Sequence, residues 1–279
     1  MTDALTFVEL TPDPRHLAEI DALREAGGWG PGSWVHGPMM QTGGRVIGLR
    51  DGGGELVAMG GAAVNPPTGF ICNMMVRPDQ KRCGHGRRLF DELVRWLRAS
   101  GYRSIELEAT EEGRPLYEQS GFRVRWQSVG SSLATPPSRG AQDGLAPLTQ
   151  ANWSDVAALD LEATGRDRGE LLRLLTEHPV YRDGVVVEGG GRIEAYGLRF
   201  DNRIGPLVAR TADAAGRVAR ELAWRSEPGT IATVGHPHHA AFWQQLGFEV
   251  TPFDVRMVLG EEPRDTPGMV YCMLNGGIG

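Results

Sequence analysis

The residues best suited to chemistry lie in one segment, Val76-Arg-Pro-Asp-Gln80-Lys-Arg-Cys-Gly84-His-Gly86-Arg-Arg-Leu89. It stands between an expected strand and an expected helix, and a helix N terminus attracts anions through its unpaired N–H groups and its dipole. Gly84 and Gly86 let the backbone approach a ligand closely and adopt unusual dihedral angles. Positive charge is added nearby by Lys81, Arg82, Arg87 and Arg88. The segment therefore predicts a site for a phosphate or pyrophosphate group.

Two common nucleotide-binding motifs do not fit this segment. A Walker loop requires Gly-x-x-x-x-Gly-Lys-Ser/Thr, and that spacing is missing here. A Rossmann unit opens with strand, helix and strand, whereas three successive strands are expected before this turn. The phosphate-binding prediction therefore points to a different fold.

The segment resembles motif A of the GNAT superfamily of acyl-CoA-dependent acyltransferases. In that motif a strand ending in Val-x-Pro is followed by Gln or Arg and then by Gly-x-Gly or Gly-x-Ala. The matching positions here are Val76, Pro78, Gln80, Gly84 and Gly86. Leu116-Tyr117-Glu-Gln-Ser-Gly121-Phe122 resembles the family's next strand–helix segment. The motif match covers residues 70–125, and the fold match covers about 1–130.

The resemblance implies acetyl-CoA as co-substrate, with its pyrophosphate on the backbone of residues 80–86 and its pantetheine between strands 70–76 and 104–109. A backbone N–H near Met75 or Val76 would polarise the thioester carbonyl, and an amine would attack it directly. Tyr117 stands at the family's general-acid position, where it would protonate the leaving thiolate. The implied binding residues are Met74, Met75, Val76, Gln80, Lys81, Arg82, Cys83, Gly84, His85, Gly86 and Arg87.

The general base is not settled by the sequence. Many family members place a glutamate on the fourth strand, but Cys72 and Asn73 stand in that neighbourhood. Glu108 is the candidate we select, and Glu106, Glu111 and His36 remain alternatives, as do water relays. A covalent acyl intermediate on Cys72 is disfavoured, because the resemblance implies direct transfer and a small buried cysteine is common.

The elements that would position these residues alternate along the first half. The patterns predict a short strand near residues 7–10, a helix after Asp13-Pro14 that stops at Gly27-Gly28, and a Gly-rich, Trp-containing loop over 29–44. That loop either borders the acceptor pocket or plugs an interface with the second half. The remaining expected elements are strands 45–50, 55–64, 70–76 and 104–109, helices 86–99 and 115–119, and a strand at 122–129 that closes the unit.

The second half repeats this plan after a Ser, Pro and Gly-rich linker at 131–144. Tyr117-Glu-Gln-Ser-Gly-Phe-Arg-Val corresponds to Trp243-Gln-Gln-Leu-Gly-Phe-Glu-Val, which indicates duplication of one domain. The expected elements are helices 152–163, 168–177, 211–224 and about 239–245, and strands 185–188, 192–200, 203–208, 230–234 and from 248.

The expected fold class is α/β (α+β), with two tandem GNAT-like domains, each a mixed, mostly antiparallel sheet flanked by helices. Residues 1–130 would form the catalytic domain and 145–279 a degenerate one. In the second half the motif A positions hold Val208, Ala212 and Ala214, and Trp243 replaces the tyrosine. We therefore expect no productive acyl-CoA site there.

Composition excludes several other classes. The net charge is −6 and the arginines are scattered, which argues against nucleic-acid binding. The sequence shows neither a signal peptide nor an apolar run long enough for a membrane span, and its three cysteines have unrelated spacings. We expect a cytoplasmic protein, monomeric or homodimeric, without a metal. His236, His238 and His239 are interpreted as loop histidines.

The expected activity is N-acetyl transfer to the amine of a small-molecule acceptor. Two alternatives stay within the enzymes, namely transfer to a protein or peptide amine and use of a longer acyl-CoA. A third alternative of a different class is a non-catalytic acyl-CoA sensor, which the missing fourth-strand acid favours.

Overall fold

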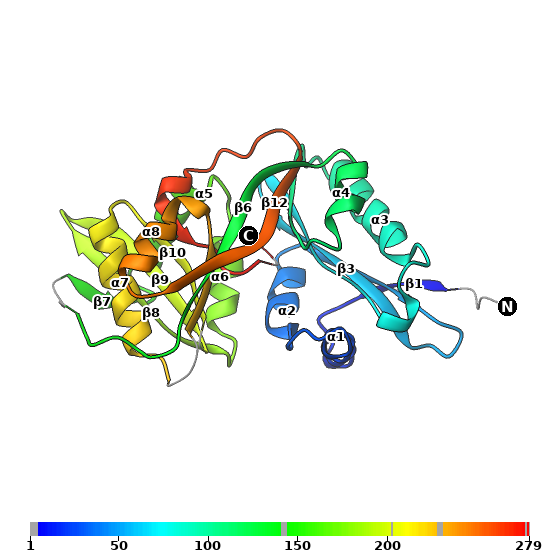
Figure 1. The fold of residues 1–279 in the computed structure, drawn as a ribbon, viewed down its shortest axis with the longest axis horizontal. Helices are drawn as coiled ribbons and strands as arrows, with labels where there is room; N and C mark the ends of the chain where they lie inside the picture. The colour runs from blue at the N-terminus through cyan, green and yellow to red at the C-terminus, as the bar shows by residue number, and fades with distance from the viewer. Residues whose placement is uncertain (1–4, 141–143, 202, 228–230, 277, 279) are drawn as a thin grey trace.

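The computed structural model describes residues 5–140, 144–201, 203–227, 231–276 and 278. The protein is a mixed α/β molecule with two lobes, and the long strands β6 and β12 cross the middle between them (Figure 1). Among the described residues, strand pairing is antiparallel except between β4 and β5 and between β10 and β11. The expected fold class is thus confirmed.

Apart from one additional helix, α2, the elements of the first half follow the predicted order. Asp13 caps α1 by accepting a hydrogen bond from the Arg15 backbone N–H at 2.8 Å. Gly84 is the N-cap residue of α3 and has φ +82°. The bounds are β1 (Thr6–Leu10), α1 (Pro14–Ala26), α2 (Ser33–Gln41), β2 (Arg45–Arg50), β3 (Leu56–Asn65), β4 (Thr68–Val76), α3 (His85–Ala99), β5 (Ser104–Ala109), α4 (Arg114–Gln119) and β6 (Arg123–Leu133).

The second half repeats the strand and helix order, as predicted, with β7 in the place of β1 and β13 as an addition. The sequence patterns indicated neither of these two short strands. The bounds are β7 (Leu145–Pro147), α5 (Trp153–Thr164), α6 (Gly169–Thr176), β8 (Tyr181–Gly189), β9 (Arg192–Phe200), β10 (Arg203–Ala209), α7 (Ala212–Trp224), β11 (Ile231–Gly235), α8 (Ala240–Gln245), β12 (Glu249–Gly260) and β13 (Val270–Cys272). Residue 230 of the expected strand 230–234 lies outside the described residues.

The two halves exchange their last long strands. Along the 13-stranded sheet of the described residues the order is β1-β2-β3-β4-β5-β12-β6-β11-β10-β9-β8-β7, with β13 paired to β10. Strand β12 therefore completes the sheet of the first half beside β5, and β6 joins β11 of the second half. The prediction that residues 122–129 close the first unit was wrong, because β6 pairs with β12 and β11 instead.

The predicted loop at 29–44 was also wrong, since it contains helix α2. Gly37 and Pro38 are weak helix formers, so local propensity does not indicate a helix. The helix is stabilised from outside: Asp21 of α1 accepts hydrogen bonds from the backbone N–H groups of Gly32 and Ser33 at 2.7 and 2.9 Å. Its buried face, which includes Val35 and Met39, packs into the core.

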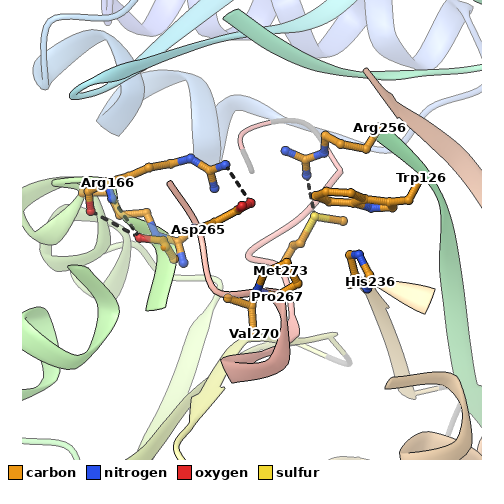
Figure 2. Close-up of a pocket in the computed structure, with 10 residues that line it drawn as sticks. Trp126, Arg166, His236, Arg256, Asp265, Pro267, Val270 and Met273 are labelled. Carbon is orange, nitrogen blue, oxygen red and sulfur yellow. Dashed lines mark hydrogen bonds and ion pairs between the residues drawn. The ribbon is translucent and has the colours of Figure 1, made fainter. Parts of the chain in front are cut away.

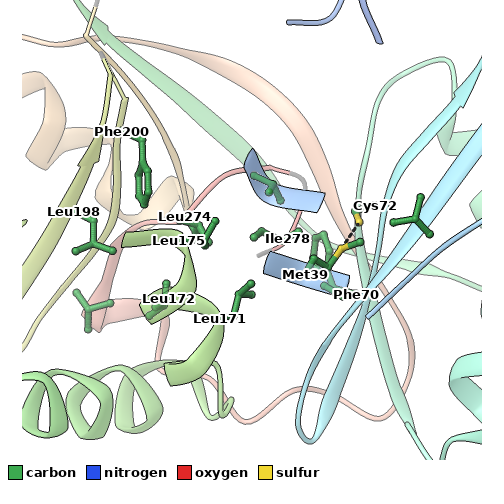
Figure 3. Packing of buried hydrophobic residues seen from close by; sticks show 14 of the residues in the cluster. Met39, Phe70, Cys72, Leu171, Leu172, Leu175, Leu198, Phe200, Leu274 and Ile278 are labelled. Carbon is green, nitrogen blue, oxygen red and sulfur yellow. Dashed lines mark hydrogen bonds between the residues drawn. The ribbon is translucent and has the colours of Figure 1, made fainter. Parts of the chain in front are cut away.

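One hydrophobic cluster spans both halves, as Figure 3 shows. Met39 and Phe70 of the first half belong to the same buried cluster as the leucines of α6 and Phe200 of the second. Leu274 and Ile278, near the end of the chain, complete the cluster. Separating the halves would expose this shared apolar surface to water, which costs free energy. Of the expected linker at 131–144, residues 131–133 belong to β6, and 141–143 lie outside the described residues.

Candidate active site

The candidate site begins where β4 and β5 separate. These parallel strands pair from Thr68 with Ser104 to Ile71 with Leu107, and β4 then continues to Val76 without a recorded partner on β5 among the described residues. A cleft of about 1240 Å³ opens there. Residues of both halves line it, from the turn before α3 to the start of β10. The resemblance places pantetheine in this gap.

A β-bulge marks the point of separation. Gly61 pairs with Cys72 and Met59 with Met75, so β4 has one residue more than β3 between these pairs. Asn73 in the bulge has φ +51°, and its side-chain oxygen accepts a hydrogen bond from Arg24 at 2.6 Å. A bulge removes backbone groups from the strand ladder, and this one lies next to the N–H groups of Met75 and Val76 that are expected to polarise the thioester.

The turn before α3 has open space beside both glycines. A Cβ atom at Gly84 would have no neighbour within 4 Å, and one at Gly86 would lie 3.6 Å from Val76 Cγ2. The positive φ of Gly84 explains the glycine at that position, whereas Gly86 has no such backbone requirement. The open space and the free helix N terminus fit a bulky anion such as pyrophosphate.

The expected CoA-binding residues gather along this part of the cleft, with one exception. Met74, Met75, Val76, Gln80, Lys81, Arg82, Gly84, His85, Gly86 and Arg87 all line it. Cys83 is exposed and does not line it; its thiol donates to the Lys81 carbonyl at 3.5 Å.

Tyr117 lies on α4 at the edge of the cleft and is 7% exposed. Its ring packs against Phe90 and Phe122, with centroid distances of 5.2 and 6.2 Å. Burial, together with the negative charge of Asp254, raises the pKa of Tyr117 above its ordinary value. The hydroxyl therefore stays protonated at neutral pH, as a general acid requires.

Glu108 also lines the cleft, but its carboxylate is engaged. Oε1 accepts hydrogen bonds from Arg256 Nε at 2.6 Å and from Ser128 Oγ at 3.1 Å. Oε2 is buried without a hydrogen-bond partner. Burial raises the pKa of Glu108, and the Arg256 guanidinium opposes that shift.

Asp254 is a candidate that sequence reasoning missed. It lies on β12, at the irregularity in pairing between Pro252 and Val255, and it lines the cleft half-buried. Burial raises its pKa, and no ion pair is recorded for its carboxylate in the described part of the chain. Only the strand exchange brings this residue near Tyr117. Pro252 hints at a break in the strand, but nothing in the sequence indicates its partner.

The other candidates for a base are less suitable. Glu106 is fully buried and paired with Arg125 and Arg166, and Glu111 is exposed outside the cleft lining. Burial lowers the pKa of His36 to about 4, while its Nδ1 donates to the Gly32 carbonyl at 2.6 Å. Burial raises the pKa of Cys72 to about 12, which keeps its thiol protonated and argues against a covalent intermediate.

A second, small cavity lies at the seam between the halves (Figure 2). Its volume of about 30 Å³ leaves room for about two water molecules, since one needs roughly 10–15 Å³. Around it Asp265 pairs with Arg125 at 2.9 Å, and Arg125 pairs with Glu106 at 2.7 Å. Arg256 approaches Glu106 at 3.9 Å in addition to binding Glu108. Arg256 joins Glu108 to this network of ion pairs and thereby holds the Glu108 carboxylate in place.

In the second half the corresponding gap is filled by the chain itself. Strands β10 and β11 share a single pair, and β13 runs antiparallel to β10 beside them. The Met273 backbone N–H donates to the Val234 carbonyl of β11 at 2.8 Å. Trp243, the counterpart of Tyr117, donates its indole N–H to the Tyr271 carbonyl at 3.0 Å. At the start of α7, Thr211 caps the Ala214 N–H at 3.2 Å. A pantetheine chain would have to displace β13.

The histidine cluster is engaged in local structure. His236 Nδ1 accepts a hydrogen bond from the His238 backbone N–H, and His239 contacts the Pro267 carbonyl at 2.8 Å and stacks on Tyr271. Among the described residues there is no group of three or more His, Cys, Asp or Glu that could hold a metal. Within the same residues no helix has the length and apolar character needed to cross a membrane.

Two family profiles match the chain in tandem. The profile of the acetyltransferase (GNAT) family matches residues 10–122, and an acetyltransferase (GNAT) domain profile matches 156–272. The chain belongs to the GNAT acetyltransferase family. The enzyme is therefore an acyltransferase, and both halves are members of one fold family, as the internal repeat indicated.

Known relatives agree with this assignment. The enzyme is 26% identical over 217 residues to the uncharacterized N-acetyltransferase YitH of Bacillus subtilis (strain 168), which is 75% of each chain. A solved structure from Pyrococcus horikoshii superposes with a TM-score of 0.84 at 21% identity, covering 99% of this chain and 96% of that one. A tandem GNAT protein from the clavulanic acid biosynthesis pathway has a TM-score of 0.64 at 17% identity, covering 94% and 100%. The two structures show a shared fold.

Proposed function

We propose that the enzyme transfers the acetyl group of acetyl-CoA to the amine of a small-molecule acceptor. The observation that carries this proposal is the open gap between β4 and β5 beside the Gly84–Gly86 turn, while the second half has its gap filled. The residues at the turn fit a pyrophosphate, since Gly84 precedes a 15-residue helix, Gly86 lies in its first turn, and no atoms crowd either glycine.

In the proposed step a neutral amine attacks the thioester carbonyl carbon. A C–N bond forms, the C–S bond breaks, and the thiolate takes the hydroxyl proton of Tyr117. The amine proton passes to a carboxylate of the cleft. Asp254 is the better placed of the two candidates, because the carboxylate of Glu108 is already bound by Arg256 and Ser128. Glu108 remains the alternative base.

A small acceptor is favoured because both halves enclose the cleft. Trp29 and Trp34 of the first half line it, and Trp34 packs on Phe200 of the second half at 5.2 Å. Trp34 thus both borders the cleft and contacts the second half, while Met39 belongs to the shared core. A protein substrate would have to insert an extended segment between the two walls.

We also propose that the catalytic domain spans 1–130 and the degenerate domain 145–279 along the chain, although their sheets share strands.

The cysteines Cys72, Cys83 and Cys272 are unpaired, which supports a reducing compartment such as the cytoplasm.

The test combines acetyl-CoA binding by calorimetry with an amine panel assayed by release of the CoA thiol. We expect binding and turnover for the wild type, and an unchanged acetyl-CoA affinity with a strongly reduced kcat for Tyr117→Phe. Tight binding without turnover on any amine, and no effect of Tyr117→Phe, would favour the sensor. Absence of acetyl-CoA binding would refute the proposal.

A further inference from the structure

One arginine stands apart from the others of this chain. Among the residues that the structure describes, six arginine side chains have no hydrogen bond, ion pair or ring contact, and five of those are exposed to solvent: Arg15, Arg82, Arg98, Arg220 and Arg264. The sixth, Arg203, is partly buried. Burial accordingly lowers its pKa from the ordinary value.

Shielding a guanidinium from water without a counter-charge costs free energy. No ion pair of the described residues involves Arg203, and burial raises the pKa of the neighbouring Cys272 thiol to about 12, so this thiol is neutral at physiological pH and supplies no counter-charge. Other buried arginines of the chain have carboxylate partners, for example Arg168 with Asp160 at 2.8 Å. The arrangement is therefore unfavourable unless a ligand supplies the missing anion.

Arg203 lies where such a ligand could reach it. It is the first residue of β10 and lines the same cleft as Tyr117 and Asp254. Figure 1 shows β10 and α3 in opposite lobes. Arg203, on β10, is one of the cleft-lining residues contributed by the half that lacks the pyrophosphate turn. An anionic ligand bound to Arg203 would thus be distinct from the pyrophosphate expected at Gly84 and Gly86.

We propose that Arg203 binds a carboxylate of the acceptor, which makes amino acids and related amino-carboxylates the substrate class of this enzyme. The planar fork of a guanidinium matches a carboxylate with two parallel hydrogen bonds. Asp254 on β12 lines the same cleft and would attract the ammonium end of the same molecule. A zwitterion would then be oriented with its nitrogen toward the thioester. The proposal rests on the proposed function.

The first test compares L-amino acids with the corresponding amino-acid amides in the thiol-release assay. We expect wild-type kcat/KM to be at least about tenfold higher for the acids, since one charge-assisted pair contributes ~1.5–3 kcal/mol. Arg203→Gln should remove this preference by raising KM for the acids, with KM for acetyl-CoA unchanged. Arg203→Lys should retain part of it. Arg15→Gln, an exposed and unpartnered arginine on α1, is the matched control. Equal use of acids and amides, or a rise confined to the KM for acetyl-CoA, would overturn the proposal.

A second measurement does not depend on turnover. Apo Arg203→Gln should melt at or above the wild-type temperature, because an uncompensated cation is removed; a structural role predicts a lower melting temperature. With CoA present, L-amino acids should raise the melting temperature of the wild type more than their amides do, and this difference should vanish in Arg203→Gln. Equal shifts for acids and amides in the wild type refute the carboxylate site. Calorimetric binding of acetyl-CoA to the wild type reports the proposed function separately.

Discussion

Replacing Gly86 by glutamate tests the pyrophosphate site with little effect on the fold. Gly86 is the second residue of α3, and a Cβ there meets only Val76 Cγ2, at an ordinary contact distance of 3.6 Å. Glycine is a poor helix former, and an acid in the first turn stabilises a helix by ~0.3–1 kcal/mol. We therefore expect the melting temperature of Gly86→Glu to equal or slightly exceed that of the wild type.

The effect on acetyl-CoA binding should be large and opposite. A carboxylate about 5 Å from each of two phosphate charges, at an effective dielectric constant of ~40, repels them by about 3 kcal/mol in total. That corresponds to a roughly hundredfold or greater rise in Kd. Isothermal titration of acetyl-CoA into the purified protein measures it, and the repulsion should shrink at high salt.

Two control variants are informative. One distinguishes the effect of the added charge from that of the added volume, and the other tests whether the effect is specific to the site. Gly86→Gln adds the same volume without the charge and should weaken binding less. Ala212→Glu places the same charge on the exposed first residue of α7, in the half whose gap β13 fills, and should leave the affinity unchanged. A folded Gly86→Glu protein with wild-type affinity for acetyl-CoA would refute the pyrophosphate assignment.

Three further outcomes are expected. Burial raises the pKa of Asp254 and the base must be ionised, so kcat/KM should fall as pH drops through a pKa above the ordinary carboxyl range. Asp254→Asn should abolish this fall at acidic pH and lower the rate ~10²–10⁴-fold. If Glu108→Gln has these two effects and Asp254→Asn does not, Glu108 is the base. Arg256→Met leaves Glu108 without its buried cation and should destabilise the protein by ~3–5 kcal/mol in denaturant unfolding, with partial recovery on adding Glu108→Gln; an unchanged midpoint contradicts the network. Calorimetry should give one acetyl-CoA per chain because β13 fills the second gap, and a measured value of two is incompatible with that assignment.

Helix α2 and strand β12 illustrate where prediction from the sequence stops. The cap of α2 comes from Asp21 on another helix, and its interior holds a glycine and a proline, so no local signal indicated it. The strand at β12 was predicted, but its pairing with β5 was not, because hydrogen-bonding partners of strands are chosen by the whole sheet. Asp254 was missed for the same reason.

Four features of this protein follow from its sequence alone: the glycine turn before α3, the position of Tyr117, the repeat of one fold and the loss of the glycines in the second copy. These features depend on short-range backbone preferences and on residue spacing, which can be recognised without knowing any long-range contact. Tertiary structure alone decided that β12 closes the first sheet, that β13 fills the second gap, and that Asp254 and Arg203 share a cleft with Tyr117. Such contacts join residues far apart in the chain, and only the burial of a common core brings them together.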